Sequence, residues 1–124
     1  MAGDAVIIAG FGFRRSATPA SLAEVLDRLC EHYGPVDRLA AAASMQTLVR
    51  RLGEARGLAV IAVPDTALAS ADTLTQSPHC LRTRSTGSVA EAVALCAAGP
   101  GAELLGPREI SVDRCATAAL AVAR

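Results

Sequence analysis

The chain has 124 residues, of which 52% are hydrophobic and 19% charged, and this composition predicts one globular domain over residues 1–124. Its twelve basic residues are all arginines and balance twelve acidic residues, so the net charge is zero and the composition argues against nucleic acid and membrane as partners. Tryptophan is absent and aromatic residues make up 2% of the chain, which excludes a base-stacking platform.

Cysteine usage and the N-terminal sequence bear on metal binding and location. Cys30, Cys80, Cys96 and Cys115 lie far apart without a C-x-x-C pair, so buried reduced thiols are the simpler interpretation, and we expect neither a metal nor a cofactor. The N-terminus lacks a basic segment followed by a long apolar run, and no stretch reaches about 18 apolar residues. The sequence therefore predicts a cytoplasmic protein.

The first twenty residues have the order strand, glycine turn, helix. Residues 5–9 are apolar throughout, as in a strand that is covered on both faces. Gly10 and Gly12 predict a turn in which the backbone comes close to a ligand. Thr18 and Pro19 are typical of the cap and first residue of a helix, whose N-terminus favours an anion.

Three polar residues follow the glycine pair. Arg14, Arg15 and Ser16 offer donors suited to a carboxylate or phosphate. The full G-x-G-x-x-G pattern fails at Arg15, and no P-loop pattern occurs. A tight turn with two solvated arginines therefore stays open as the alternative.

Residues 19–33 predict a helix that ends at Gly34-Pro35, with a capping-box pattern formed by Ser21 and Glu24. Its apolar stripe consists of Leu22, Val25, Leu26 and Leu29. His32 is interpreted as stabilising the C-terminus of this helix.

Residues 37–43 predict a short strand, and Ser44 a cap for a second helix that Gly57 ends. The inward face of that helix is expected to contain Met45, Leu48, Val49, Leu52 and Ala55, and the outward face Arg50, Arg51 and Glu54. Residues 58–63 give the clearest pattern of a buried strand.

The second half of the chain contains another polar loop. We expect a short helical turn from Pro64 to about Ala69, loop over 70–78, a strand over 79–83 and the loop 84–88. Ser88 and Glu91 have capping-box spacing at the start of a helix over 89–98, which Gly99-Pro100-Gly101 ends. The inward face of that helix is expected to contain Val89, Ala92, Val93 and Cys96.

Two closing strands are predicted over 103–105 and 115–122, joined through 106–114, although residues 116–121 are equally compatible with a helix. The whole pattern predicts one three-layer α/β/α domain, with a mostly parallel, mixed sheet of five or six strands and helices on both faces. Ligands of such sheets bind beyond the carboxyl ends of strands, so the loops 10–18 and 84–88 are expected to share one cleft.

Several segments carry a family resemblance: Gly10-Phe11-Gly12-Phe13-Arg14-Arg15, the run 87–95, Leu104-Leu105-Gly106-Pro107-Arg108 and the run 116–121. In this order, over about residues 5–123, they resemble the family of the stand-alone cobalamin-biosynthesis protein CobE and the C-terminal domain of the cobalt-precorrin-5A hydrolase CbiG. The resemblance implies an α/β sandwich and a role in building the corrin ring of vitamin B12. The two-domain relative opens a lactone and releases acetaldehyde, whereas the family offers no settled reaction for the single-domain form.

The chain departs from this family at three positions. A Lys of the family and a Glu three residues on align with Ala43 and Gln46, so neither ionisable group is present here. A Lys near the closing hairpin aligns with Arg108, which keeps the charge but not the chemistry of an amine. These departures count against a catalytic Lys and Glu pair.

The candidate site residues follow from both loops. A precorrin is a macrocycle ringed with carboxylates, and its binding is expected to use Gly10, Gly12, Arg14, Arg15, Ser16, Thr86, Gly87 and Ser88. Arg82 and Arg84 either join them or form an exposed strand edge. Glu91 is a weak catalytic candidate, because a capping box already explains it, and His79 and Cys80 would point to opposite faces of a strand.

Three functions remain open at the level of sequence. The leading prediction is an accessory protein that binds a precorrin intermediate. The alternatives are a hydrolase acting on a precorrin lactone and a non-catalytic subunit that contacts other corrin-pathway enzymes; a homo-oligomer is also left open.

Overall fold

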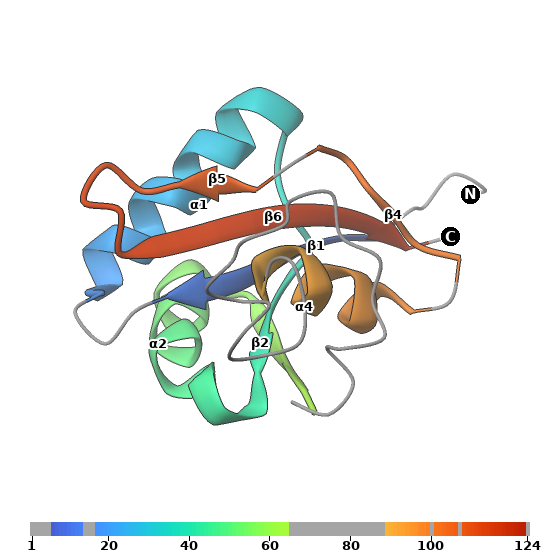
Figure 1. The fold of residues 1–124 in the computed structure, drawn as a ribbon, viewed down its shortest axis with the longest axis horizontal. Coiled ribbons are helices and arrows are strands. Elements are labelled where there is room, and N and C mark those ends of the chain that lie inside the picture. The colour runs from blue at the N-terminus through green and yellow to red at the C-terminus, as the bar shows by residue number, and fades with distance from the viewer. Residues whose placement is uncertain (1–5, 14–16, 65–88, 100, 107, 124) are drawn as a thin grey trace.

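The computed structural model describes residues 6–13, 17–64, 89–99, 101–106 and 108–123. Two long strands form the centre of its sheet: β1 (Val6–Phe13) and β6 (Ala116–Ala123) pair antiparallel along their whole length (Figure 1). Both strands consist almost entirely of apolar residues, because helices cover the sheet on each side.

The remaining strands extend the sheet on both sides of this pair. β2 (Arg38–Ala42) pairs parallel with β1, and β3 (Ala59–Val63) pairs parallel with β2. β4 (Glu103–Leu104) and β5 (Glu109–Ile110) both pair antiparallel with β6. The sheet of the described residues therefore has six strands, with its parallel part confined to β1, β2 and β3.

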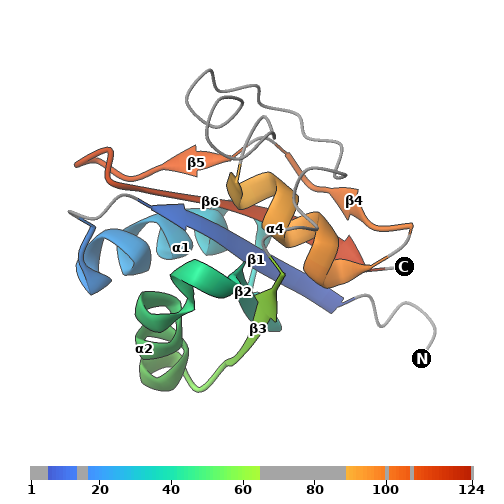
Figure 2. The same cartoon turned by 60° about the horizontal axis from the view of Figure 1, so that its bottom comes forward.

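Helices cover both faces of this sheet. α1 (Pro19–Tyr33) and α2 (Gln46–Arg56) lie on one face and α4 (Val89–Ala98) on the other (Figure 2). Side chains alternate along β1, so Ala9 and Phe11 enter the core under α1 and α2, whereas Ile8 enters the core under α4. The predicted α/β domain with a mixed sheet and helices on both faces is confirmed. The expectation that the sheet is mostly parallel is wrong for the described strands, because β6 pairs antiparallel with β1, β4 and β5.

The first helix has the predicted bounds and the predicted cap, Thr18, but a different capping-box partner. The predicted stripe of Leu22, Val25, Leu26 and Leu29 is buried, and Gly34 follows the last turn with φ 98°. The capping box joins Thr18 and Ser21, so the predicted pairing of Ser21 with Glu24 is wrong. The Glu24 carboxylate instead accepts a hydrogen bond from the Val112 N–H, at 3.1 Å from its Oε1.

The second helix begins later than predicted. Residues 43–45 form a 3₁₀ turn, η1 (Ala43–Met45), and α2 begins at Gln46 without a side-chain cap, so the assignment of Ser44 as the cap is wrong. Gly57 ends α2 in the left-handed conformation, as predicted. Ala55 is exposed because it lies on the side of α2 that faces away from the sheet.

Two predicted strands differ in their surroundings. β3 forms, but it has only one neighbouring strand among the described residues. Its two alanines are exposed, Val60 and Ile61 are half-buried and only Val63 is buried, so the prediction of a fully buried strand is wrong. Residues 116–121 are strand rather than helix, because pairing with β1, β4 and β5 outweighs the helix propensity of alanine. The connection over 106–114 contains β5, which the sequence analysis does not predict.

The third helix, α4, has the predicted bounds, and its first half is buried on all sides rather than along one stripe. The predictions for 14–16, for 65–88 and for the break at Pro100 lie outside the described residues.

Candidate functional site

The Gly-x-Gly pair lies within β1 rather than in a turn. Gly10 is opposite Ala119 and Gly12 is opposite Thr117, and both glycines are buried, so the predicted turn at these residues is wrong. The strand continues because its partner β6 is as long as β1. The predicted strand over residues 5–9 therefore covers only the first part of β1, which continues to Phe13.

Gly10 is the place where α4 rests on the sheet. A Cβ at Gly10 would lie 2.5 Å from the Ala90 carbonyl oxygen and closer still to the Ala94 nitrogen. The backbone of α4 thus lies directly against Gly10. The absence of a side chain allows a close packing of helix on strand here.

Gly12 brings together the described ends of the two predicted loops. A Cβ at Gly12 would lie 3.2 Å from the Val89 Cβ. Gly12 comes shortly before residues 14–16, and Val89 directly follows residues 84–88. The described residues beside each loop are therefore neighbours, although the loops themselves lie outside the described residues.

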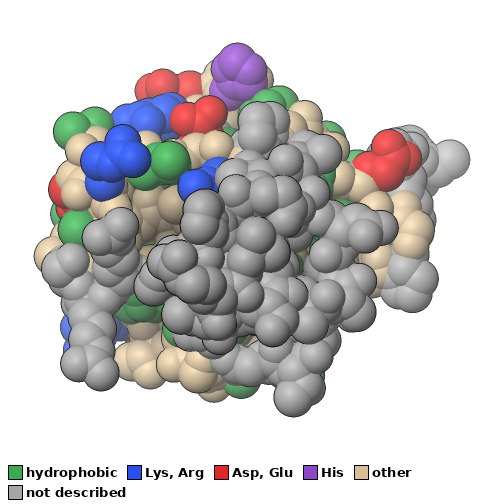
Figure 3. Space-filling view, in the orientation of Figure 1, with side chains coloured by type: hydrophobic (Ala, Val, Ile, Leu, Met, Phe, Trp, Pro, Cys, Tyr) green, Lys and Arg blue, Asp and Glu red, His purple; other side chains and the backbone are tan. Residues whose placement is uncertain are grey.

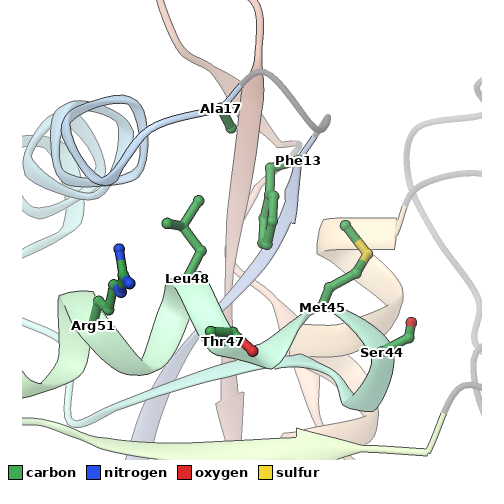
Figure 4. A pocket seen from close by; sticks show the side chains of 7 residues that line it. All are labelled: Phe13, Ala17, Ser44, Met45, Thr47, Leu48 and Arg51. Atoms are coloured by element: carbon green, nitrogen blue, oxygen red, sulfur yellow. The ribbon is translucent and has the colours of Figure 1, made fainter.

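A cavity of about 350 Å³ opens beside this end of β1 (Figure 4). It is lined by Phe13, Ala17, Ser44, Met45, Thr47, Leu48 and Arg51. Phe13 ends β1, and Ser44 and Met45 follow the end of β2, so the cavity lies beyond the carboxyl ends of two parallel strands. Open α/β sheets bind their ligands at this place.

The cavity wall joins both core layers. Phe13 and Leu48 pack against the core under α1 and α2, whereas Met45 packs against the core under α4. In Figure 4, the Phe13 ring extends from β1 between Leu48 and Met45. All three are half-buried and give the cavity an apolar floor.

Helical spacing aligns the polar part of the wall. Arg51 lies four positions after Thr47 and three after Leu48 on α2, so its side chain lies on the same side of the helix as both. Thr47 and Arg51 are exposed, and within the described part of the chain the Arg51 guanidinium makes no hydrogen bond and no ion pair. An unpaired cation thus stands at the rim of an apolar floor.

The neighbouring Arg50 is in a different situation. Its Nε donates a hydrogen bond to Gln46 Oε1 at 2.6 Å, and Gln46 Nε2 donates in turn to the Ala43 carbonyl at 3.2 Å. Ala43 and Gln46 are the positions aligned with the Lys and Glu of the resemblance, and they lie in the chain beside the cavity-lining Ser44 and Met45.

Glu91 lies away from the cavity wall. Its side chain is fully buried, and Oε2 accepts a hydrogen bond from the Arg108 N–H at 2.9 Å. Its predicted partner Ser88 lies outside the described residues. The described contact makes Glu91 a link between α4 and the β4–β5 connection.

A second polar cluster holds the start of α1 against the β5–β6 turn. Asp113 accepts hydrogen bonds from Ser111 Oγ and Ser21 Oγ, each at 2.5 Å, and from the Cys115 N–H at 3.0 Å. The hydroxyl donors, Ser111 first, hold the pKa of the Asp113 carboxyl below its usual value. Each of these hydrogen bonds joins Asp113 either to the start of α1 or to its own turn, so the role of the cluster is structural.

The cysteines and acidic residues give no metal site in the part of the chain that the structure describes, where no three His, Cys, Asp or Glu side chains form a suitable group. Cys30, Cys96 and Cys115 form no disulfide within the described ranges. Burial raises the pKa of the Cys30 and Cys96 thiols, which makes both weak nucleophiles near neutral pH.

Charged side chains of both signs lie together over α1 and β5 on the face shown in Figure 3. Arg28 pairs there with Glu24 at 2.6 Å and with Glu109 at 3.8 Å.

Among the described residues, no helix is both long enough and apolar enough to cross a bilayer.

The sequence does not predict the cavity, because its pattern places Met45 and Leu48 on the core face of α2 and Arg51 on the solvent face. The signal that points to them is their position directly after the end of β2. The predicted ligand residues Arg14, Arg15, Ser16, Thr86, Gly87 and Ser88 lie outside the described residues, so their role stays a prediction.

Comparison with known proteins identifies relatives over the whole domain. The model of the family described as cobalamin synthesis G C-terminus matches residues 7–123. No curated protein sequence gives a significant match.

Solved structures give a consistent result. CobE, a protein from the cobalamin (vitamin B12) biosynthetic pathway, is 30% identical with a TM-score of 0.83, covering 96% of this chain and 91% of that chain. The cobalamin biosynthesis protein chiG from Agrobacterium tumefaciens is 28% identical with a TM-score of 0.71, covering 94% of this chain and 97% of that chain. A cobalamin biosynthesis protein G homologue from Sulfolobus solfataricus shares the fold, with 17% identity and a TM-score of 0.76 over 97% of this chain and 37% of its own.

Proposed function

The chain belongs to the cobalamin synthesis G C-terminus family, and from this premise we propose that it binds a precorrin intermediate beyond the carboxyl ends of β1 and β2. The observation that carries the proposal is the cavity at this place, which has an apolar floor and, at its rim, Arg51, an arginine without a hydrogen bond or ion pair in the described part of the chain. A macrocycle with a hydrocarbon ring and acetate and propionate arms needs both an apolar floor and cationic donors.

The two predicted loops supply further donors in this proposal. Phe13 and Ala17 line the cavity, and the three residues between them are Arg14, Arg15 and Ser16. The contact of Gly12 with Val89 supports a shared cleft with Thr86, Gly87 and Ser88. Several carboxylates of one macrocycle would then be held from two sides.

A binding role fits the cavity wall better than hydrolysis. Among the described residues that line it there is no carboxylate, imidazole or thiol that would serve as a general base. The buried Glu91 is used by the Arg108 amide. The alternative of a hydrolase acting on a precorrin lactone therefore depends on residues other than these.

The test is an absorbance titration of purified precorrin intermediates with the wild type, Arg14→Ala and Arg15→Ala. We expect each variant to bind about tenfold more weakly, because each loses a charge-assisted hydrogen bond. Arg38→Ala is the matched control, since Arg38 is exposed at the amino end of β2, the opposite end of that strand from the cavity.

The other functions predict different results in the same titration. A time-dependent change in the ligand spectrum, with release of acetaldehyde, would indicate a hydrolase. No binding of any intermediate would contradict the proposal and would leave a subunit that contacts other corrin-pathway enzymes, which co-purification with those enzymes would test.

A further inference from the structure

The cavity beside Phe13 has the size and charge for part of a macrocycle. Resting on the proposed function, we infer that it takes one edge of the ring, and that Arg51 binds the carboxylate arm on that edge. The rest of the ring then stays outside the cavity.

Arg51 is the cation at the cavity that can bind a carboxylate arm. It is exposed, lines the cavity and makes no hydrogen bond or ion pair within the described part of the chain, whereas the adjacent Arg50 is bound to Gln46. No acidic residue is among the described lining residues, so none of them competes with Arg51 for an incoming carboxylate or repels it. A guanidinium binds a carboxylate through two parallel hydrogen bonds.

The floor of the cavity offers apolar surface to the edge of a ring. Phe13, Met45 and Leu48 are half-buried, so their remaining apolar surface is available to a ligand. The methyl and methylene groups on the edge of a corrin precursor would cover that surface. Met45 is flexible and polarizable, which suits an irregular, non-planar ring edge.

The volume of the cavity favours binding of one edge of the macrocycle over binding of the whole ring. The cavity of about 350 Å³ lies near the lower end of the range of about 300–1,000 Å³ for small-molecule sites. A macrocycle with eight carboxylate arms is larger than a typical drug-sized ligand and does not fit such a volume. Edge binding therefore leaves most of the ring open to solvent or to a second protein.

The experiment uses uroporphyrin and coproporphyrin as stable carboxylated macrocycles, together with the purified full chain. The chain has only two methionines, Met1 and Met45. Labelling with [methyl-¹³C]methionine thus gives two NMR signals, one of which reports directly on the cavity. Absorbance titration measures affinity in parallel for the wild type, Arg51→Leu, Arg51→Lys and Arg50→Leu.

We expect both porphyrins to shift the Met45 methyl signal in the wild type. Arg51→Leu should weaken binding about tenfold or more, because it removes a charge-assisted contact. Arg51→Lys should restore part of the affinity, since it keeps the charge but not the fork of donors. Arg50→Leu should change the affinity less than twofold.

Different failures separate this inference from the proposed function. Binding that leaves the Met45 signal unchanged, or that is as tight in Arg51→Leu as in the wild type, overturns the edge-binding inference and leaves the proposed function standing. Absence of binding by both porphyrins and by precorrin intermediates overturns both. Equal weakening in Arg50→Leu would show a general charge effect and would also overturn the role of Arg51.

Discussion

The two faces of the sheet are packed in different ways. The face under α1 and α2 is filled by large side chains, namely Phe11, Leu22, Leu26, Leu29, Leu39 and Leu120. The face under α4 is filled by smaller ones, namely the alanines Ala40, Ala42 and Ala92 and the β-branched Ile8, Val63, Val89 and Val93, and α4 lies directly against the bare backbone of Gly10. Large side chains separate helix and sheet, whereas small ones let α4 approach the strand closely.

The two faces therefore differ in what they contribute to stability and to the position of the proposed cleft. Apolar burial is greatest under α1 and α2, so that face supplies most of the stability. The close contact of α4 with β1 fixes the position of Val89 beside Gly12, and with it one described end of the proposed cleft. The α4 face therefore tolerates added volume least, and the α1 face tolerates lost volume least.

Gly10→Val is expected to have the largest effect. Its Cβ would overlap the backbone at Ala90 and Ala94, which cannot move as a side-chain end does. We expect a loss of more than about 4 kcal/mol in the free energy of unfolding, which approaches the whole stability of a small domain. Urea unfolding followed by circular dichroism measures it.

Gly12→Ala is the matched control within the same strand. Its Cβ would meet the side chains of Thr117 and Val89 at 3.2 Å, and side chains can yield by a few tenths of an ångström. We expect a cost of about 1 kcal/mol. If Gly10→Val costs no more than Gly12→Ala, the close packing of α4 on β1 is not a constraint on the fold.

Leu26→Ala tests the opposite face by removing volume. Leu26 is fully buried between α1 and the sheet, so its truncation should leave a cavity and cost about 3 kcal/mol. Val112→Ala is the control, because Val112 is 76% exposed and should change the stability by less than about 0.5 kcal/mol. Equal effects of the two substitutions would contradict the assignment of the core.

The sequence predicts the helices better than the surroundings of the strands. The bounds of α1 follow from the Thr18 cap, the apolar stripe and Gly34, and the end of α4 follows from Gly99, which are local signals. The surroundings of β3, which has one neighbouring strand among the described residues, and the length of β1 depend on which strand lies beside them, and no local pattern contains that information.

The candidate site shows the same limit. Gly10 and Gly12 indicate a place where something comes close to the backbone, but the sequence cannot distinguish a ligand from a helix, and at Gly10 it is α4. Arg51 has an ordinary solvent-facing pattern on α2. Its position in the cavity wall depends on the 3₁₀ turn η1, which shifts the start of the helix beyond the end of β2.

Asp113→Asn tests the hydrogen bonds that hold the N-terminal end of α1 against the β5–β6 turn. The lowered pKa means that the ionised carboxylate stabilises the fold above its unfolded-state pKa of about 3.9 and loses this effect as the pH falls through the lower folded-state pKa. The variant should therefore melt at a lower temperature than the wild type at pH 7, and the gap should narrow in acid. Thermal melts between about pH 7 and pH 3 measure it.

A constant gap across that range would show that the charge of Asp113 is not the source of the stability. Ser111→Ala is the companion variant, because Ser111 Oγ donates to Asp113 and accepts from the Ala116 N–H. It should lower the melting temperature at every pH.

The ion pair between Asp27 and Arg56 should have the smallest effect. It joins α1 to α2 across the same face, with two hydrogen bonds of 2.8 and 3.1 Å, yet the two side chains are 56% and 36% exposed. The hydrogen bond from Arg56 lowers the pKa of Asp27, so the pair is intact above about pH 4 and is lost in acid. Solvent screening limits the coupling energy in a double-mutant cycle of Asp27→Ala and Arg56→Ala to about 0.2–1 kcal/mol at pH 7.

The same cycle in high salt separates the two ways in which α1 and α2 are held together. A surface pair weakens when the Debye length falls to about 3 Å in 1 M salt, whereas apolar burial does not. We expect the coupling energy to vanish there while the cost of Leu26→Ala stays unchanged. A coupling energy above about 2 kcal/mol that survives 1 M salt would contradict this, since it would mean that an ion pair holds the α1–α2 layer as strongly as its buried leucines do.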